Sequence, residues 1–95
     1  MIIYSDDFGR IANTDVHMIS WYGHKANEDV FEYFVVVESP TTEKRFPLAR
    51  CKTEDAAKSL VSQIATAAFR GAAYVTILEG RLCLTALNTV QDNTT

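Results

Sequence analysis

Residues 47–71 read PLARCKTEDAAKSLVSQIATAAFRG and carry the clearest structural signals in this chain of 95 residues. Thr53 is a good N-cap residue, and the two acidic residues that follow it, Glu54 and Asp55, are stabilising at the positive end of a helix dipole. Gly71 stands where a C-terminal cap is expected. These signals predict one helix between Thr53 and Gly71.

Apolar residues recur along this helix at the spacing of one face. We expect the core-facing side to consist of Ala57, Leu60, Val61, Ile64, Ala65 and Ala68. The opposite side is polar, and we expect it in solvent with Lys58, Ser59, Ser62, Gln63, Thr66 and Arg70. Small alanines allow a helix to approach a sheet closely, so we interpret this helix as the cover of the core and not as the functional element.

Strand patterns lie on both sides of the helix. Before it we expect strands at 1–5, 16–22, 30–39 and 44–50, with a further short piece at 10–12, and after it strands at 72–78 and 81–87. The order β-β-β-β-α-β-β predicts an α+β fold, in which a mostly antiparallel sheet of five to six strands carries the helix on one face. Residues 23–29 (GHKANED) are interpreted as a polar loop, and Glu79-Gly80 as a hairpin turn.

Alternation within the strand at 30–39 assigns its two faces. One face is predicted to lie in the core, together with Trp21 and the inward residues of the next strand; its members are Phe31, Tyr33, Val35, Val37, Phe46 and Leu48. Pro47 cannot donate a hydrogen bond, so its strand should be an edge strand or be bulged there.

Length and composition indicate one domain at 1–88 and a flexible polar tail at 89–95. The N-terminus lacks the pattern of a secretory signal, and no apolar run approaches the roughly 20 residues of a membrane span. We therefore expect a cytoplasmic protein. Cys51 and Cys83 are expected to be free thiols, and no cofactor or metal site is expected.

The charge is unevenly distributed along the chain. The formal net charge is −3, but most of the acidic residues lie in the first half and most of the basic residues in the second. A protein that binds nucleic acid in bulk is normally basic overall, so this class is disfavoured.

A single helix covers only one face of a sheet, and the second face of the two central strands is also apolar. Met18, Tyr22, Phe34 and Val36 lie on that face, and four acidic residues lie near them: Glu28, Asp29, Glu32 and Glu38. Sheet curvature or the terminal hairpin could bury this face. The alternative is a surface for a protein partner or for a homodimer, as expected of an apolar patch with a polar rim.

A basic stretch offers a different function. Five cations fall within fifteen residues, and they could bind phosphate groups of a nucleic acid: Lys44, Arg45, Arg50, Lys52 and Lys58. Acidic residues interleaved among them weaken the local field, and a solvated, charge-protected edge strand explains the same pattern.

Catalytic patterns are weak. Asp6-Asp7 could hold a cation or act as an acid–base pair, but Asp is common in turns. Ser20, His17 and Asp15 could be combined into a triad, but no nucleophile-elbow motif surrounds them. We expect a non-enzymatic protein, with a small enzyme as the third choice after the two binding functions.

Asn13, Val16 and Ile19, a strand hairpin, and LARCKTEDAAKSLVSQI together resemble a loose group of small phage and prophage proteins. That group has a β-meander followed by a "T-E-x-A" helix, and the resemblance covers roughly residues 10–70. Some small phage proteins of this size inhibit bacterial defence complexes, CRISPR effectors among them. The resemblance implies a phage-type inhibitor that acts in the host cytoplasm. Together with the acidic first half of the chain, it suggests that an acidic surface competes for a basic groove on a nucleic-acid-handling complex. It assigns no functional residue.

Overall fold

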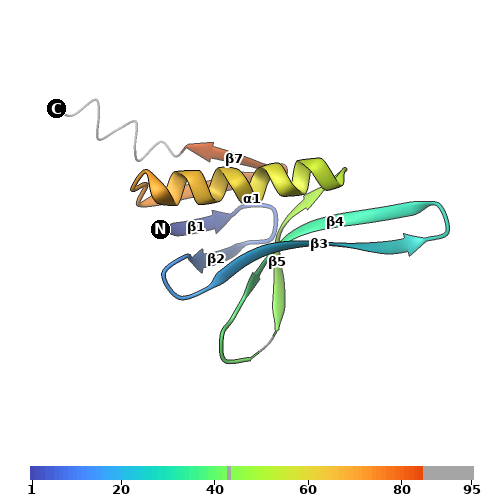
Figure 1. The fold of residues 1–95 in the computed structure, drawn as a ribbon, viewed down its shortest axis with the longest axis horizontal. Coiled ribbons are helices and arrows are strands. Elements are labelled where there is room, and N and C mark those ends of the chain that lie inside the picture. Colours follow the sequence, from blue (N-terminus) through green and yellow to red (C-terminus); the bar gives the residue numbers. More distant parts are fainter. Residues whose placement is uncertain (43, 85–95) are drawn as a thin grey trace.

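The computed structural model describes residues 1–42 and 44–84 (Figure 1). Within these residues the chain forms five strands, a helix and two further strands, in the order β1 (Ile2–Ser5), β2 (Arg10–Asn13), β3 (Met18–Asn27), β4 (Val30–Glu38), β5 (Arg45–Cys51), α1 (Glu54–Phe69), β6 (Tyr74–Leu78) and β7 (Arg81–Leu84). The predicted α+β class is confirmed. The predicted tail and residues 85–87 lie outside the described residues.

The strands form two sheets, so the prediction of a single sheet is wrong. One sheet has the order β2-β1-β6-β7 and the other the order β3-β4-β5. The first strand pairs in parallel with β6, so that Ile3 lies opposite Val75. This pairing joins segments far apart in the sequence, which local strand patterns cannot indicate.

The helix has the predicted ends. The Thr53 hydroxyl accepts a hydrogen bond from the backbone N–H of Ala56 at 3.0 Å. At the other end the N–H groups of Gly71 and Ala72 donate to the carbonyls of Ala68 and Ala67, and Gly71 has a φ of +82°. This is the Schellman arrangement, which favours glycine because the left-handed conformation costs it nothing.

The core-facing side of the helix differs in part from the prediction. Ala57, Leu60 and Ile64 are buried as expected, and Val61 packs against the same core. Ala65 and Ala68, however, are exposed, and Ala67 packs against the core instead. Positions 57, 60, 64 and 67 follow one 3.6-residue repeat. Alanine is compatible with either side, so its identity gives no sign of orientation.

The predicted core face of β4 is correct except near the turn that follows β3. Val35, Val37 and Leu48 are buried, and Trp21 and Tyr33 pack partly buried against the same cluster. Phe31, which was predicted to be inside, is 56% exposed, and Phe46 is 39% exposed. These two residues lie toward the ends of their strands, where α1 gives less cover.

Side chains from the β1–β2 region join the two sheets. The register of β4 with β5 shifts at Leu48, which is the extra residue of a bulge beside Pro47. The buried Ser5 hydroxyl donates to the Leu48 carbonyl, and Arg10 Nη1 donates to the Pro47 carbonyl at 2.9 Å. The register shift confirms the predicted bulge. The carbonyl groups of Pro47 and Leu48 in this bulge accept the hydrogen bonds that join the two sheets.

The long β3–β4 hairpin projects from the body (Figure 1). The prediction of a loop at 23–29 is wrong, because β3 continues to Asn27 and only Glu28 and Asp29 form the turn. A bulge lies between Lys25 and Asn27, and Asn27 Oδ1 accepts the N–H of Asp29. Cross-strand pairing with β4 overrides the weak strand preference of these polar residues.

Two further observations concern the chain as a whole. Cys51 and Cys83 are both free, as expected, and Cys51 is buried. Among the described residues, no helix has both the length and the apolar character that a membrane crossing requires.

Candidate protein-interaction site

We define the arm as residues 22–34, the outer part of the β3–β4 hairpin. Its outer face, away from α1, carries three rings from two strands: Tyr22 and His24 from β3, and Phe34 from β4. The ring centroids lie 5.7–6.1 Å apart, and the rings are stacked with interplanar angles of 13–29°. Tyr22 and Phe34 are directly opposite in the register, which brings their rings together.

Two ion pairs flank these rings. Arg45 Nε lies 2.8 Å from Glu38 Oε1, and the Arg45 guanidinium also lies over the Tyr22 ring. Arg50 Nη2 pairs with Glu32 Oε1, and His24 Nε2 lies 3.6 Å from the other oxygen of Glu32. Both predicted acidic residues of β4 therefore have cationic partners, and the outer face is nearly balanced in charge.

The other face of the arm is also aromatic. Phe31 and Tyr33 stack with their centroids 6.3 Å apart. Gly23 lies opposite Tyr33, and a Cβ atom at Gly23 would come within 2.8 Å of the Tyr33 ring. Glycine is therefore required at position 23, because it lets the Tyr33 ring approach the backbone of β3 closely. This contact packs the base of the arm.

The predicted interface residues differ in accessibility. Met18 is 65% exposed, whereas Tyr22 and Phe34 are half-buried within the outer face. Val36 is only 1% exposed, so its prediction as a contact residue is wrong. It lies on the central strand of its sheet, between Ser20 of β3 and Pro47 of β5.

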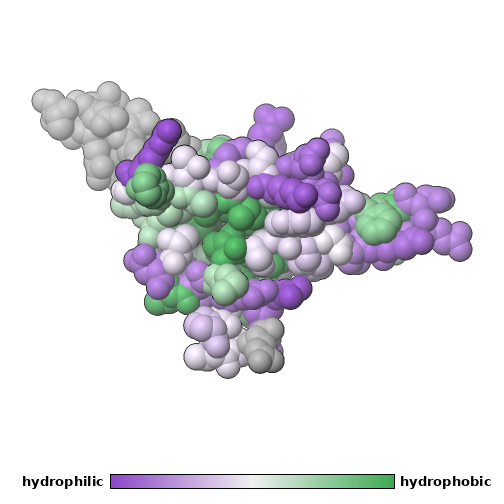
Figure 2. Space-filling model, in the orientation of Figure 1, coloured by the Kyte–Doolittle hydropathy of each residue, from purple (hydrophilic) through white to green (hydrophobic). Residues whose placement is uncertain are grey.

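The turn of the arm combines exposed apolar and acidic residues. Val30 is 43% exposed and Phe31 56% exposed, beside the exposed turn residues Glu28 and Asp29. Figure 2 shows apolar surface on the arm bordered by hydrophilic surface at its end. In the part of the chain that the structure describes, Glu28 and Asp29 have no cationic partner, in contrast to Glu32 and Glu38.

The structure disperses the basic stretch. Arg45 and Arg50 point across the outer face to carboxylates, and Lys58 on α1 pairs with Glu54 and lies over the Trp21 ring. Lys44 and Lys52 are exposed, and no ion pair joins them to another described residue. The five cations do not form one phosphate-binding surface.

The residues considered for catalysis have structural contacts. Asp7 Oδ1 and Oδ2 accept the N–H groups of Glu79 and Gly80. His17 Nδ1 accepts the N–H of Asn13, and Asp15 lies 3.7 Å from the N-terminal ammonium group. Within 1–42 and 44–84, no cluster of three or more His, Cys, Asp or Glu residues could hold a metal ion.

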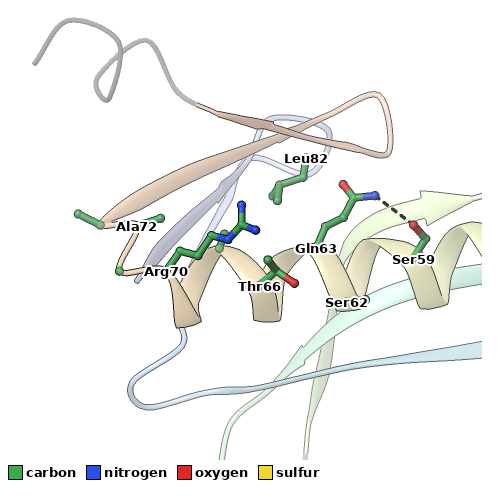
Figure 3. A pocket seen from close by; sticks show the side chains of 10 residues that line it. Ser59, Ser62, Gln63, Thr66, Arg70, Ala72 and Leu82 are labelled. Carbon is green, nitrogen blue, oxygen red and sulfur yellow. Dashed lines mark hydrogen bonds between the residues drawn. The ribbon is translucent and has the colours of Figure 1, made fainter. Parts of the chain in front are cut away.

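A groove of about 650 Å³ lies between α1 and β7 (Figure 3). The helix wall is formed by polar residues that were predicted to face solvent, with Gln63 donating to the Ser59 hydroxyl at 3.0 Å. Leu82 and Ala72 contribute the apolar part of the opposite wall. This part of the polar side of the helix is therefore partly enclosed, and Arg70 is the charged residue among those that line the groove.

Sequence reasoning missed His24 and the exposure of Phe31. His24 was assigned to a loop, although its position two residues after Tyr22 would place both rings on one face of a continued strand.

Comparison of the chain with protein-family models, with curated proteins and with solved structures finds no match.

Proposed function

We propose that this chain is a non-enzymatic protein-binding module that engages its partner through the β3–β4 arm. The observation that carries the proposal is the exposure of Val30 and Phe31 on a projecting two-stranded arm. An isolated two-stranded hairpin is marginally stable in water, so a partner that covers these side chains would stabilise the arm as well as gain affinity.

The stacked rings of Tyr22, His24 and Phe34 support the same function. Aromatic residues are enriched at the energetic centres of protein interfaces, and stacking orders these rings before binding. The two flanking ion pairs, Arg45–Glu38 and Arg50–Glu32, would form the polar rim of such an interface.

The specific form that we propose is a phage-type inhibitor of a nucleic-acid-handling defence complex. Glu28 and Asp29 supply the negative charge that would compete for a basic groove, because Glu32 and Glu38 are already paired. Two acidic residues at the end of a projecting arm would enter a groove more readily than a flat acidic surface.

Affinity capture from host lysate with matched variants tests the proposal. Phe31→Asp should reduce capture of the partner at least tenfold, because it puts a charge into the apolar contact. Phe69→Asp, at the 93% exposed end of α1, makes the same substitution elsewhere and should capture as wild type does. Equal capture by both variants would contradict binding through the arm.

The acidic end and the oligomeric state need separate measurements. Combined Glu28→Gln and Asp29→Asn should weaken inhibition of the complex, and full inhibition by this variant would exclude the charge-based form. Light scattering on wild type and on Phe34→Asp determines whether the partner is a second copy of this chain. A dimer that Phe34→Asp dissociates would identify the outer face as the dimer contact.

The rival function, nucleic-acid binding through Lys44, Arg45, Arg50, Lys52 and Lys58, has less support. Three of these cations are paired with carboxylates, and binding would have to break those pairs. Gel retardation that falls steeply with salt would favour this function over the first.

A further inference from the structure

A second site lies at the opposite end of β4 from the arm. A cavity of about 290 Å³ is formed between β2, the residue before β3, the C-terminal end of β4 and the start of β5. Its lining residues are Arg10, Ile11, His17, Val37, Ser39 and Phe46. Ile11, Val37 and Phe46 make its apolar walls. None of these residues belongs to the arm, so the site is independent of the function proposed above.

Arg10 is held in place before any ligand arrives. Its Nη1 donates to the Pro47 carbonyl at 2.9 Å, and its guanidinium carbon lies 5.0 Å from the centre of the Phe46 ring. A guanidinium group has five N–H donors, and this contact uses one of them. No carboxylate among the described residues pairs with Arg10, although Arg45 and Arg50 each have one.

His17 contributes a second donor. Its Nδ1 accepts the backbone N–H of Asn13 at 3.1 Å, so in the neutral ring the hydrogen is on Nε2. The backbone N–H of His17 also donates to the Asn13 carbonyl, which holds the residue from both sides. The ring is therefore oriented with one nitrogen used by the fold and the other available as a donor.

The polar lining of the cavity is rich in donors and poor in acceptors. The other polar side-chain atom of the lining, Ser39 Oγ, is already hydrogen-bonded to the Thr41 hydroxyl at 3.2 Å. A cavity with a preorganised cation, an available N–H and apolar walls is complementary to an anion that has an apolar body. A carboxylate matches the planar fork of a guanidinium group better than a spherical anion does.

We propose that this cavity binds a small organic carboxylate, whose charge pairs with Arg10 and His17 and whose apolar body lies against Ile11, Val37 and Phe46. The cavity volume of about 290 Å³ lies just below the usual range for ligand sites, which is roughly 300–1,000 Å³. It suits a molecule of about ten non-hydrogen atoms, since one water occupies about 30 Å³ in the liquid. A free acid and the terminal carboxylate of a peptide share this chemistry.

Titration of the ¹⁵N-labelled full chain with benzoate, monitored by NMR at constant ionic strength and pH 7, tests the proposal. Benzoate should shift the amide signals of Ile11, His17 and Phe46 with one saturating curve. Benzamide has the same shape without the charge and should bind at least tenfold more weakly. Equal binding of the two, or no shift of these signals at 20 mM benzoate, would overturn the proposal.

Two variants and a second ligand pair sharpen the result. Arg10→Gln should weaken benzoate binding at least tenfold, and Arg81→Gln, the same change on β7, should leave it unaltered. If Arg10→Gln does not fold, the comparison of benzoate with benzamide on the wild-type chain still decides. N-acetyl-phenylalanine, compared with its amide, tests the same dependence on charge with a peptide-like ligand. If N-acetyl-phenylalanine binds more tightly than benzoate, the natural ligand is a peptide terminus; if it binds more weakly, the natural ligand is a free acid.

Discussion

Asp7 supports a strained turn from a distant part of the chain, and its removal should be costly. The β6–β7 turn places Glu79 at a φ of +51° and Gly80 at a φ of +70°. Both angles are required by a type I′ turn, but glutamate rarely adopts a positive φ. The two oxygens of Asp7 accept the N–H groups of these residues at 2.8 and 2.9 Å. The carboxylate therefore stabilises the conformation that Glu79 disfavours.

The expected cost of Asp7→Ala follows from these two bonds. A hydrogen bond to a charged group contributes about 1.5–3 kcal/mol, and solvent near this exposed turn reduces that value. We expect a loss of about 2 kcal/mol in the free energy of unfolding, since both bonds disappear together. For a domain of this size that corresponds to a fall in the urea midpoint of about 1–2 M and in Tm of roughly 8–16 °C.

Urea unfolding monitored by the fluorescence of Trp21, the single tryptophan, measures this cost. Asp6→Ala is the matched control, because the Asp6 carboxylate accepts only a 3.5 Å hydrogen bond from the Tyr4 hydroxyl, and its backbone N–H bond to Ile77 is kept in the variant. It should change stability by less than about 0.5 kcal/mol. Asp7→Asn keeps one acceptor oxygen, so its loss of stability should lie between those of Asp7→Ala and Asp6→Ala. Equal midpoints for Asp7→Ala and Asp6→Ala would refute the reasoning.

Two other perturbations have defined outcomes. Gly23→Ala should lower the free energy of unfolding by about 1–2 kcal/mol, because the added methyl group would displace the Tyr33 ring. This cost should disappear in a Tyr33→Ala background. A cost that persists in that background would exclude the ring as its cause. Burial raises the pKa of the Cys51 thiol, so the folded state holds this proton more tightly than the unfolded state. Stability should therefore fall as pH rises above the ordinary thiol pKa of about 8.5. Cys51→Ala should flatten that fall between pH 8 and 10 in thermal melts and Cys83→Ala should not; an identical pH dependence in both variants would contradict this assignment.

Local signals were sufficient for the helix and for the hairpin turn. Thr53, Gly71 and the Glu79-Gly80 pair act on their immediate neighbours, so their roles could be read from the sequence and are confirmed. The alternation of β4 likewise identified Val35 and Val37 as core residues.

Features that depend on distant pairing could not be predicted in this way. The exposure of Phe31 depends on where α1 stops covering the sheet, and the burial of Val36 depends on its neighbours in β3 and β5. The arm was missed because polar residues at 23–27 have little strand preference of their own. The cavity with Arg10 and His17 brings together four separate strands or turns, and no spacing in the sequence indicates it.

The parallel pairing of β1 with β6 also has a consequence for synthesis of the chain. β1 is synthesised before β6, its partner in the sheet, which follows about 70 residues later, as the pairing of Ile3 with Val75 shows. At translation rates of about 5–20 residues per second, this delay lasts roughly 4–14 s. During that time β3, β4, β5 and α1, which are contiguous, can assemble, whereas the apolar segment Ile2–Ser5 has only β2 beside it. Until β6 has emerged, the edge of β1 that pairs with β6 therefore stays unpaired and open to another strand.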